Sequence, residues 1–237
     1  MCGRFAVSDS VNESIEAFVL STGRKPQEWS ADWESRFNIA PTEQIPVLLD
    51  SAKTREVRFE RAHWSLVPSW SKTLKPGYAT HNARAEVLFE KSTWKGPIKS
   101  HRAIIPASGF FEWTGEKGAK QPWFIHNPEE PVLGFAGLYS WWLNRALAED
   151  DPNRWTLTAT IVTSDAVETL AGIHDRNPVI LPEHMWEWWM DPSLVGDQAM
   201  VDEAVRAGVA AASELEFYRV APIKAKDEGP QVIAPIE

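Results

Sequence analysis

The chain has little cysteine: Cys2 is the single one among 237 residues. One cysteine excludes an internal disulfide, so a reducing cytoplasm is the expected location. No hydrophobic run approaches the roughly 20 residues that a membrane-spanning helix needs. The N-terminal residues also lack the apolar core of a signal peptide. We therefore expect no membrane partner.

Several catalytic and structural signatures are also missing. No HxH, CxxC or HExxH spacing occurs, which argues against a zinc site, and no Gly-x-Ser-x-Gly turn suggests a serine hydrolase. We expect neither a metal nor a cofactor. No Gly/Ser-rich linker or internal repeat divides the chain, which predicts a single domain over residues 1–237.

The charge is unevenly distributed. A net charge of −9 disfavours a nucleic-acid partner at first sight, but residues 53–102 hold 11 lysines and arginines against four glutamates. That segment carries +7 and leaves −16 for the rest of the chain. Either it forms a local track for phosphates, or its charges are scattered over a solvated surface. Most of the 13 tryptophans are expected in the core, and a few are candidates for stacking on bases.

Apolar periodicity predicts many short strands, peripheral helices and no regular βαβ alternation. This pattern is typical of an α+β fold with a strongly bent, barrel-like and mainly antiparallel sheet. Strands are expected over 2–7, 45–49, 55–59, 103–105, 109–114, 123–126, 133–139, 156–163 and 216–220. Helices are expected from Ser10 to Gly23, within 84–94, and over 165–172, 183–190 and 195–211, with a loop over 174–178.

Cys2 is the first candidate for chemistry. Removal of Met1 leaves an α-amine and a thiol on adjacent carbons. An α-amine with a pKa of about 7.7–8.0 is substantially neutral near pH 7, so it can attack an aldehyde, and the thiol can then close a thiazolidine ring. Met-Cys-Gly also begins glutaminase domains of N-terminal-nucleophile amidotransferases, in which the thiol attacks an amide. A third alternative is that Cys2 has no special role.

Three other positions carry candidate polar groups. If their segment is extended, Asn82 and Arg84 lie on one face of a strand. Alternatively, Asn82 caps the start of a helix and Arg84 is a surface residue. Glu112 stands among aromatic residues, where burial would raise its pKa and suit it to proton transfer, unless it points to solvent. His174, next to Asp175, is either a proton donor near a phosphate or part of a structural turn.

The ordered motifs resemble one family, the SOS response-associated peptidase (SRAP) proteins. The resemblance covers nearly the whole chain and is specific as an ordered set, although each piece is short. The motifs are Met1–Phe5, Phe37–Pro41, Trp64–Pro68, Asn82–Glu86, Pro106–Trp113, Phe135–Leu138 and Ile173–Pro178.

The resemblance implies a SRAP fold and a protein that senses abasic sites in single-stranded DNA during the SOS and DNA-damage response. It implies a thiazolidine crosslink through Cys2, a lyase-like activity, together with self-cleavage by the same thiol as an autopeptidase. Glu112 would be the acid/base, His174 would protonate the sugar oxygen, and Asn82 would orient the amine or the sugar. The implied DNA-binding residues are Arg4, Arg84 and Arg176 at phosphates, Asn38 and Pro41 in the pocket, and Trp64, Leu66 and Trp70 at bases. We expect a cytoplasmic monomer that associates with the nucleoid when bound to DNA.

Overall fold

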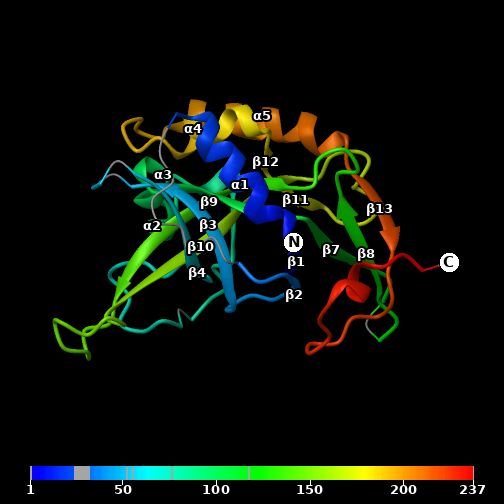
Figure 1. The fold of residues 1–237 in the computed structure, drawn as a ribbon, viewed down its shortest axis with the longest axis horizontal. Helices are drawn as coiled ribbons and strands as arrows, with labels where there is room; N and C mark the ends of the chain where they lie inside the picture. The colour runs from blue at the N-terminus through cyan, green and yellow to red at the C-terminus, as the bar shows by residue number, and fades with distance from the viewer. Residues whose placement is uncertain are drawn as a thin grey trace.

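The structure is a computed structural model that describes residues 2–23, 33–51, 53–54, 56–75, 77–116 and 118–236. Met1, whose removal the chemistry of Cys2 requires, lies outside these residues, as does Arg55 at the start of a predicted strand. Two β-sheets form the body of the molecule, and helices lie on its outside (Figure 1).

The larger sheet closes into a five-stranded barrel, in the order β10-β4-β3-β6-β9 and back to β10. All neighbours in this ring are antiparallel except β4 and β10, which are parallel. Many side chains on its strands are fully buried, such as Leu48, Ile104 and Leu138. The strands are β3 (Gln44–Asp50), β4 (Val57–Trp64), β6 (Arg102–Ala107), β9 (Leu133–Leu143) and β10 (Trp155–Asp165). The predicted α+β fold with a barrel-like sheet is confirmed.

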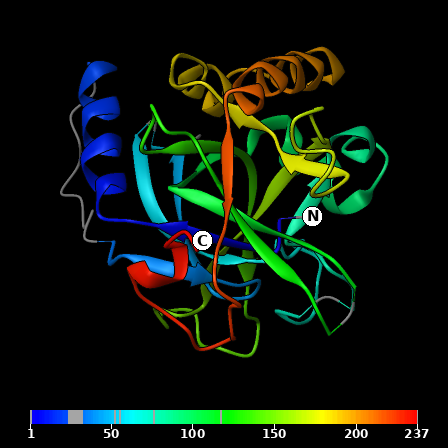
Figure 2. The same cartoon turned by 90° about the vertical axis from the view of Figure 1, so that its right-hand side faces the viewer.

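The second sheet has the order β13-β8-β7-β1-β2, and every pairing in it is antiparallel. Its strands are β1 (Arg4–Val7), β2 (Arg36–Ile39), β7 (Gly109–Thr114), β8 (Gln121–His126) and β13 (Glu216–Arg219). β13 is the edge strand of this sheet, and in Figure 2 it runs, in orange, down the front of the molecule. β1 pairs with β7 on one side and with β2 on the other, so the first residues of the chain are held within this sheet.

Three short strands extend the barrel: β5 (Asn82–Arg84), β11 (Arg176–Pro178) and β12 (Ile180–Leu181). β5 lies parallel to β10 and β11 lies antiparallel to it, so β10 supports two of the predicted motifs. The helices are α1 (Ser10–Ser21), α2 (Ser92–Lys95), α3 (Pro97–Ser100), α4 (Trp186–Met190), α5 (Gln198–Ser213), and the 3-10 turns η1 (Ala85–Val87), η2 (Glu183–Met185) and η3 (Pro230–Ile233). Among the segments described, no helix is long and apolar enough to cross a membrane.

Helix α1 follows from its apolar spacing. Val11, Ile15 and Phe18 recur on one face, and all three are buried. The chain turns away at Gly23, whose φ of +72° is favourable for glycine because it has no Cβ. The Asp9 side chain makes no capping hydrogen bond, and its carboxylate accepts one from the Ser35 hydroxyl instead.

The helix predicted over 165–172 is wrong. Strand β10 continues to Asp165, and hydrogen-bonded turns follow in place of a helix. Val167 and Leu170 are buried by these turns, which gives the same apolar spacing as a short helix. The predicted loop over 174–178 is also partly wrong, because Arg176–Pro178 pairs with β10 as β11.

Arg102 fixes the helices that follow the barrel. Its side chain is fully buried, and its guanidinium donates hydrogen bonds to five backbone carbonyls. The acceptors are Ile98, Lys99, Trp189, Asp191 and Leu194. This arginine from the basic segment therefore has a structural role and is not available to a phosphate.

Candidate active site

Cys2 and Asn82 meet at the edge of the barrel. Cys2 precedes β1 and is fully buried, and Asn82 opens β5, opposite Ile161 of β10. The Asn82 Nδ2 donates a hydrogen bond to the Cys2 carbonyl oxygen at 2.7 Å. Within the described part of the chain, the buried Oδ1 of Asn82 has no hydrogen-bond partner. The carboxamide thus fixes the Cys2 backbone and leaves an acceptor for a further donor.

Glu112 lies on β7, the strand that pairs with β1. Because Arg4 is opposite Phe111, the next position along β7 lies beside the start of the chain. The residue is only 4% exposed, and burial raises the pKa of its carboxyl to about 7. Burial, followed by the nearby charge of Glu112, raises the pKa of the Cys2 thiol. Glu112 can therefore both donate and accept a proton near neutral pH, whereas the thiol stays protonated.

His174 faces Glu112 from the turn before β11. Its Nε2 lies 3.9 Å from Oε2 of Glu112, which is longer than a direct hydrogen bond but short enough for one small group to contact both. Burial lowers the pKa of His174, which favours the neutral ring.

The other ring nitrogen of His174 has two neighbours. Its Nδ1 lies 3.0 Å from the Arg176 backbone nitrogen and 2.8 Å from Oδ1 of Asp175. In the neutral ring, Nδ1 accepts the amide hydrogen, and the ring proton is then on Nε2, directed at Glu112. When protonated, Nδ1 can donate to Asp175. The turn therefore accommodates both states of the imidazole.

The Arg176 side chain connects the turn that carries His174 to the strand that carries Asn82. Its guanidinium donates to both carboxylate oxygens of Glu86 at 2.9 Å, to Asp165 at 2.6 Å and to the Thr163 carbonyl at 2.8 Å. The family resemblance implies a phosphate contact for Arg176, but in this structure its guanidinium is occupied by these groups. Such paired, charge-assisted contacts hold the turn in one position.

Arg4 and Asn38 form a second polar pair beside β1. Arg4 donates a hydrogen bond to Oδ1 of the buried Asn38. The Asn38 Nδ2 donates to the carbonyls of Lys224 and Asp227 at 3.0 and 2.8 Å, which anchors the C-terminal segment there. Asn38 therefore orients Arg4.

Arg4 also lines an open pocket of about 350 Å³ together with Trp113 and Lys120. Sequence reasoning missed Lys120, because nothing in its neighbourhood indicates that the turn between β7 and β8 returns it to Arg4. The only available signal was its position on the hairpin that carries Glu112.

The remaining predicted DNA-binding residues lie in different environments. Arg84 is exposed, Pro41 is half-buried, and the Trp70 side chain is 59% exposed. Trp64 and Leu66, for which the sequence predicts contact with a base pair, are both fully buried. The Trp64 indole N–H donates to the His81 carbonyl at 2.9 Å, and its ring packs edge-on against Phe5. Of these three apolar candidates, Trp70 is the one that is exposed.

Four side chains from distant parts of the chain thus converge: Cys2, Asn82, Glu112 and His174. Thiol, carboxamide, carboxyl and imidazole groups together suit covalent chemistry on a carbonyl carbon. Among the residues that the structure describes, no group of three or more histidine, cysteine, aspartate or glutamate side chains is arranged to hold a metal ion.

Comparison with known proteins places this arrangement in a family. The family model described as SOS response associated peptidase (SRAP) matches residues 1–223. Abasic site processing protein YoqW of Bacillus subtilis (strain 168) is 34% identical over 193 residues, 81% of each chain. Abasic site processing protein HMCES of Gallus gallus is 30% identical over an alignment that covers 100% of this chain and 78% of that protein.

A solved structure shows the same fold. The crystal structure of a protein from Bacteroides thetaiotaomicron superposes with a TM-score of 0.76 at 23% identity and covers all of both chains. The family match spans most of the sequence, and the relatives match over most of their own length. The chain therefore belongs to the SOS response associated peptidase (SRAP) family.

Proposed function

We propose that this protein processes abasic sites in single-stranded DNA by capturing their aldehyde in a covalent crosslink to Cys2. The observation that carries the proposal is the convergence of Asn82, Glu112 and His174 on a buried Cys2. Relatives that are named abasic site processing proteins support it. The proposal requires removal of Met1, which we assign to self-cleavage by the same thiol.

The crosslink forms in two steps. First, the neutral α-amine of Cys2 attacks the aldehyde carbon of the ring-opened sugar, and loss of one water gives an imine. Second, the thiol adds across the C=N bond: sulfur bonds to carbon, and the thiol proton passes to nitrogen. A protonated thiol suits this order, because the amine reacts first and sulfur is needed only to close the ring.

Glu112 and His174 move the protons. A carboxyl with a pKa of about 7 can give a proton to the departing water and take one from the thiol. The Nε2–H of His174 donates to the sugar ring oxygen and thereby favours the open aldehyde. The free Oδ1 of Asn82 accepts a hydrogen bond from the Cys2 amine or from a sugar hydroxyl.

The DNA strand lies across the edge of the barrel at which Cys2 and Asn82 meet. Arg4, held by Asn38, and the exposed Arg84 bind flanking phosphates, and Pro41 lines the path. Trp70 offers a stacking surface to a base.

We propose that the protein acts as a single-domain monomer in the cytoplasm and is associated with the nucleoid when bound to DNA.

The test is a denaturing gel after incubation with single-stranded DNA that contains one abasic site. The processed wild-type chain should give a heat-stable complex, and Cys2→Ala should give none while it still shifts the DNA in a native gel. An equally strong heat-stable complex with Cys2→Ala would refute the proposal. Release of ammonia from glutamine without a DNA complex would instead indicate an amidohydrolase that uses the same thiol.

A further inference from the structure

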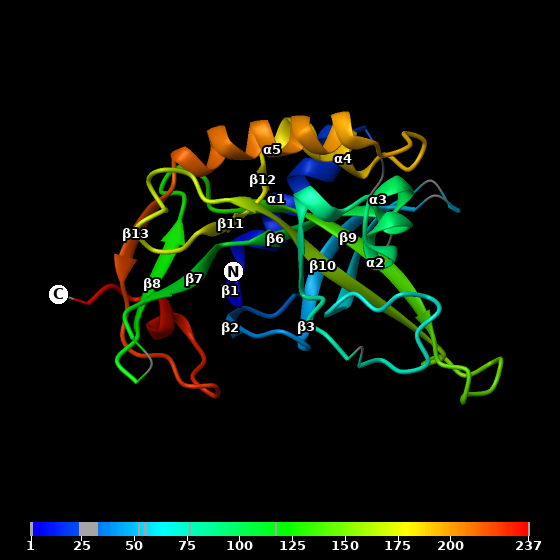
Figure 3. The same cartoon turned by 180° about the vertical axis from the view of Figure 1, so that it is seen from behind.

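A second pocket, of about 560 Å³, lies between the hairpin formed by β9 and β10 and the turn that joins β3 to β4. Its volume is within the roughly 300–1,000 Å³ usual for small-molecule sites. In Figures 1 and 3 this hairpin projects to the side of the molecule opposite β7 and β8, which flank the N-terminus. The pocket is therefore separate from the Cys2 site.

Strand periodicity places the pocket on the face of the hairpin that the DNA path does not use. Trp142 points to the other face, where its indole N–H donates to the Ser71 carbonyl at 3.0 Å in the loop that carries Trp70. Trp141, the residue before Trp142 on β9, therefore points away from that loop, as does Trp155 on β10.

The pocket offers an aromatic platform. Trp141 is opposite Leu157, so Trp155 is its diagonal cross-strand neighbour on the same face. The Trp155 side chain is 54% exposed, which is unusual for a large indole. Tyr139 and His101, which also line the pocket, form an edge-to-face pair with ring centroids 5.0 Å apart. A planar ring can stack on the exposed indole.

Cations border the same pocket. Lys53, in the turn between β3 and β4, makes no ion pair within the residues described, and Arg58 pairs with Glu60. Asp50 is close by but only 3% exposed. Lys53 is therefore the group best placed to bind an anion at this rim. It belongs to the basic segment of the sequence, residues 53–102.

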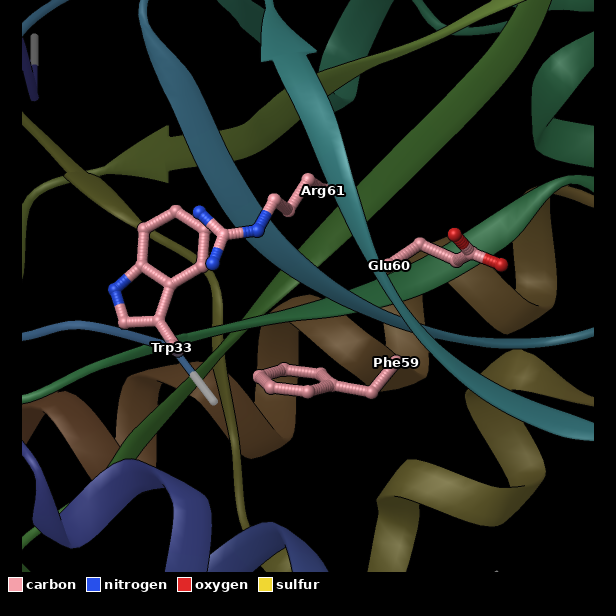
Figure 4. Close-up of a pocket in the computed structure, with 4 residues that line it drawn as sticks. All are labelled: Trp33, Phe59, Glu60 and Arg61. Atoms are coloured by element: carbon pink, nitrogen blue, oxygen red, sulfur yellow. The ribbon is translucent and has the colours of Figure 1, made fainter. Parts of the chain in front are cut away.

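The pocket in Figure 4 lacks these properties. It measures about 180 Å³ and lies between Trp33 and residues Phe59, Glu60 and Arg61 of β4. The Arg61 guanidinium already lies over the Trp33 ring at 4.9 Å, so its cation and aromatic surface contact each other.

We propose that the hairpin pocket is a nucleotide-binding site, with the base stacked on Trp155 beside Trp141 and the phosphate bound by Lys53. The nucleotide is either free or part of a DNA strand that continues around the hairpin. Because the pocket and the Cys2 site share no residue, this site does not depend on the crosslinking chemistry.

The test measures binding of dAMP and of an unmodified oligothymidylate to the Cys2→Ala chain, which cannot crosslink. Trp155→Ala should weaken binding of at least one probe by about fivefold or more, the range for loss of one base stack. Lys53→Glu should also weaken it. The control Phe217→Ala removes an aromatic side chain that is 39% exposed on β13, and it should have no effect.

The two probes distinguish the source of the nucleotide. Trp155-dependent binding of dAMP identifies a free nucleotide, and dependence seen with the oligonucleotide alone identifies a DNA strand. Binding of neither probe, or binding that Trp155→Ala and Lys53→Glu leave unchanged, would overturn the proposal. Crosslinking of a short abasic oligonucleotide by the Trp155→Ala chain should remain at the wild-type rate, so the two proposals can fail independently.

Discussion

The burial of Glu112 should make the stability of the protein depend on pH in a way that one substitution removes. The carboxyl is 4% exposed, and burial raises its pKa from 4.5 to about 7. A shift of one pKa unit corresponds to about 1.4 kcal/mol. The shift of Glu112 therefore means that ionising this carboxyl costs the folded state about 3 kcal/mol more than it costs the unfolded chain. Below pH 4.5 the group is protonated in both the folded and the unfolded chain. As pH rises to 7, the unfolded chain releases the proton first, and folding stability falls.

Glu112→Gln removes this loss because glutamine does not ionise. In urea unfolding, the variant should gain about 3 kcal/mol relative to wild type between about pH 4 and pH 8, whatever their difference at pH 4. The control is Glu116→Gln, an exposed carboxyl on the following turn, which should show no comparable gain. If the difference between Glu112→Gln and wild type is the same at both pH values, the fold does not desolvate this carboxyl. Its role as an acid/base at neutral pH would then lose its physical basis.

Three further outcomes follow from the contacts. His174→Ala should slow crosslinking to abasic DNA by about a hundredfold or more, the usual value of a general acid, with affinity for unmodified single-stranded DNA unchanged; an unchanged rate would exclude the imidazole from the reaction. Glu86→Gln breaks the ion pair that holds Arg176, so crosslinking should slow while stability falls by only about 1 kcal/mol, since the Glu86 side chain is 51% exposed; a stability loss without any change in rate would contradict a positioning role. Arg102→Met leaves five carbonyls without their donor and should destabilise the chain by about 3–5 kcal/mol in urea unfolding; a loss below about 1 kcal/mol would show that these carbonyls regain other partners.

Local patterns in the sequence were sufficient for much of the fold. The spacing of Val11, Ile15 and Phe18 identified α1, and the strand predicted over 109–114 coincides with β7. Local patterns failed where two different local structures can bury apolar residues at the same spacing. Val167 and Leu170 are buried by turns, and an isolated window cannot distinguish those turns from a helix.

The candidate site, like the fold, was predicted in part from the sequence. Ordered motifs singled out Cys2, Asn82, Glu112 and His174, and tertiary pairing brings them together. The sequence did not show which of the candidate side chains are buried. Trp64 looked like a surface aromatic, but its indole N–H finds a partner at His81 inside the protein. Whether an arginine meets solvent or a carboxylate depends on strands far apart in the chain, as the Glu86 contacts of Arg176 show.

The most direct test of the central claim is the intact mass of the protein after incubation with abasic single-stranded DNA. The chain that begins at Cys2 should gain the mass of the DNA less one water, as imine formation and ring closure require. Chains that still carry Met1 at the end of the incubation should carry no adduct, because their Cys2 nitrogen is an amide. An adduct of equal yield on the Met1-retaining chain, or none on the processed chain, would contradict capture by a free aminothiol.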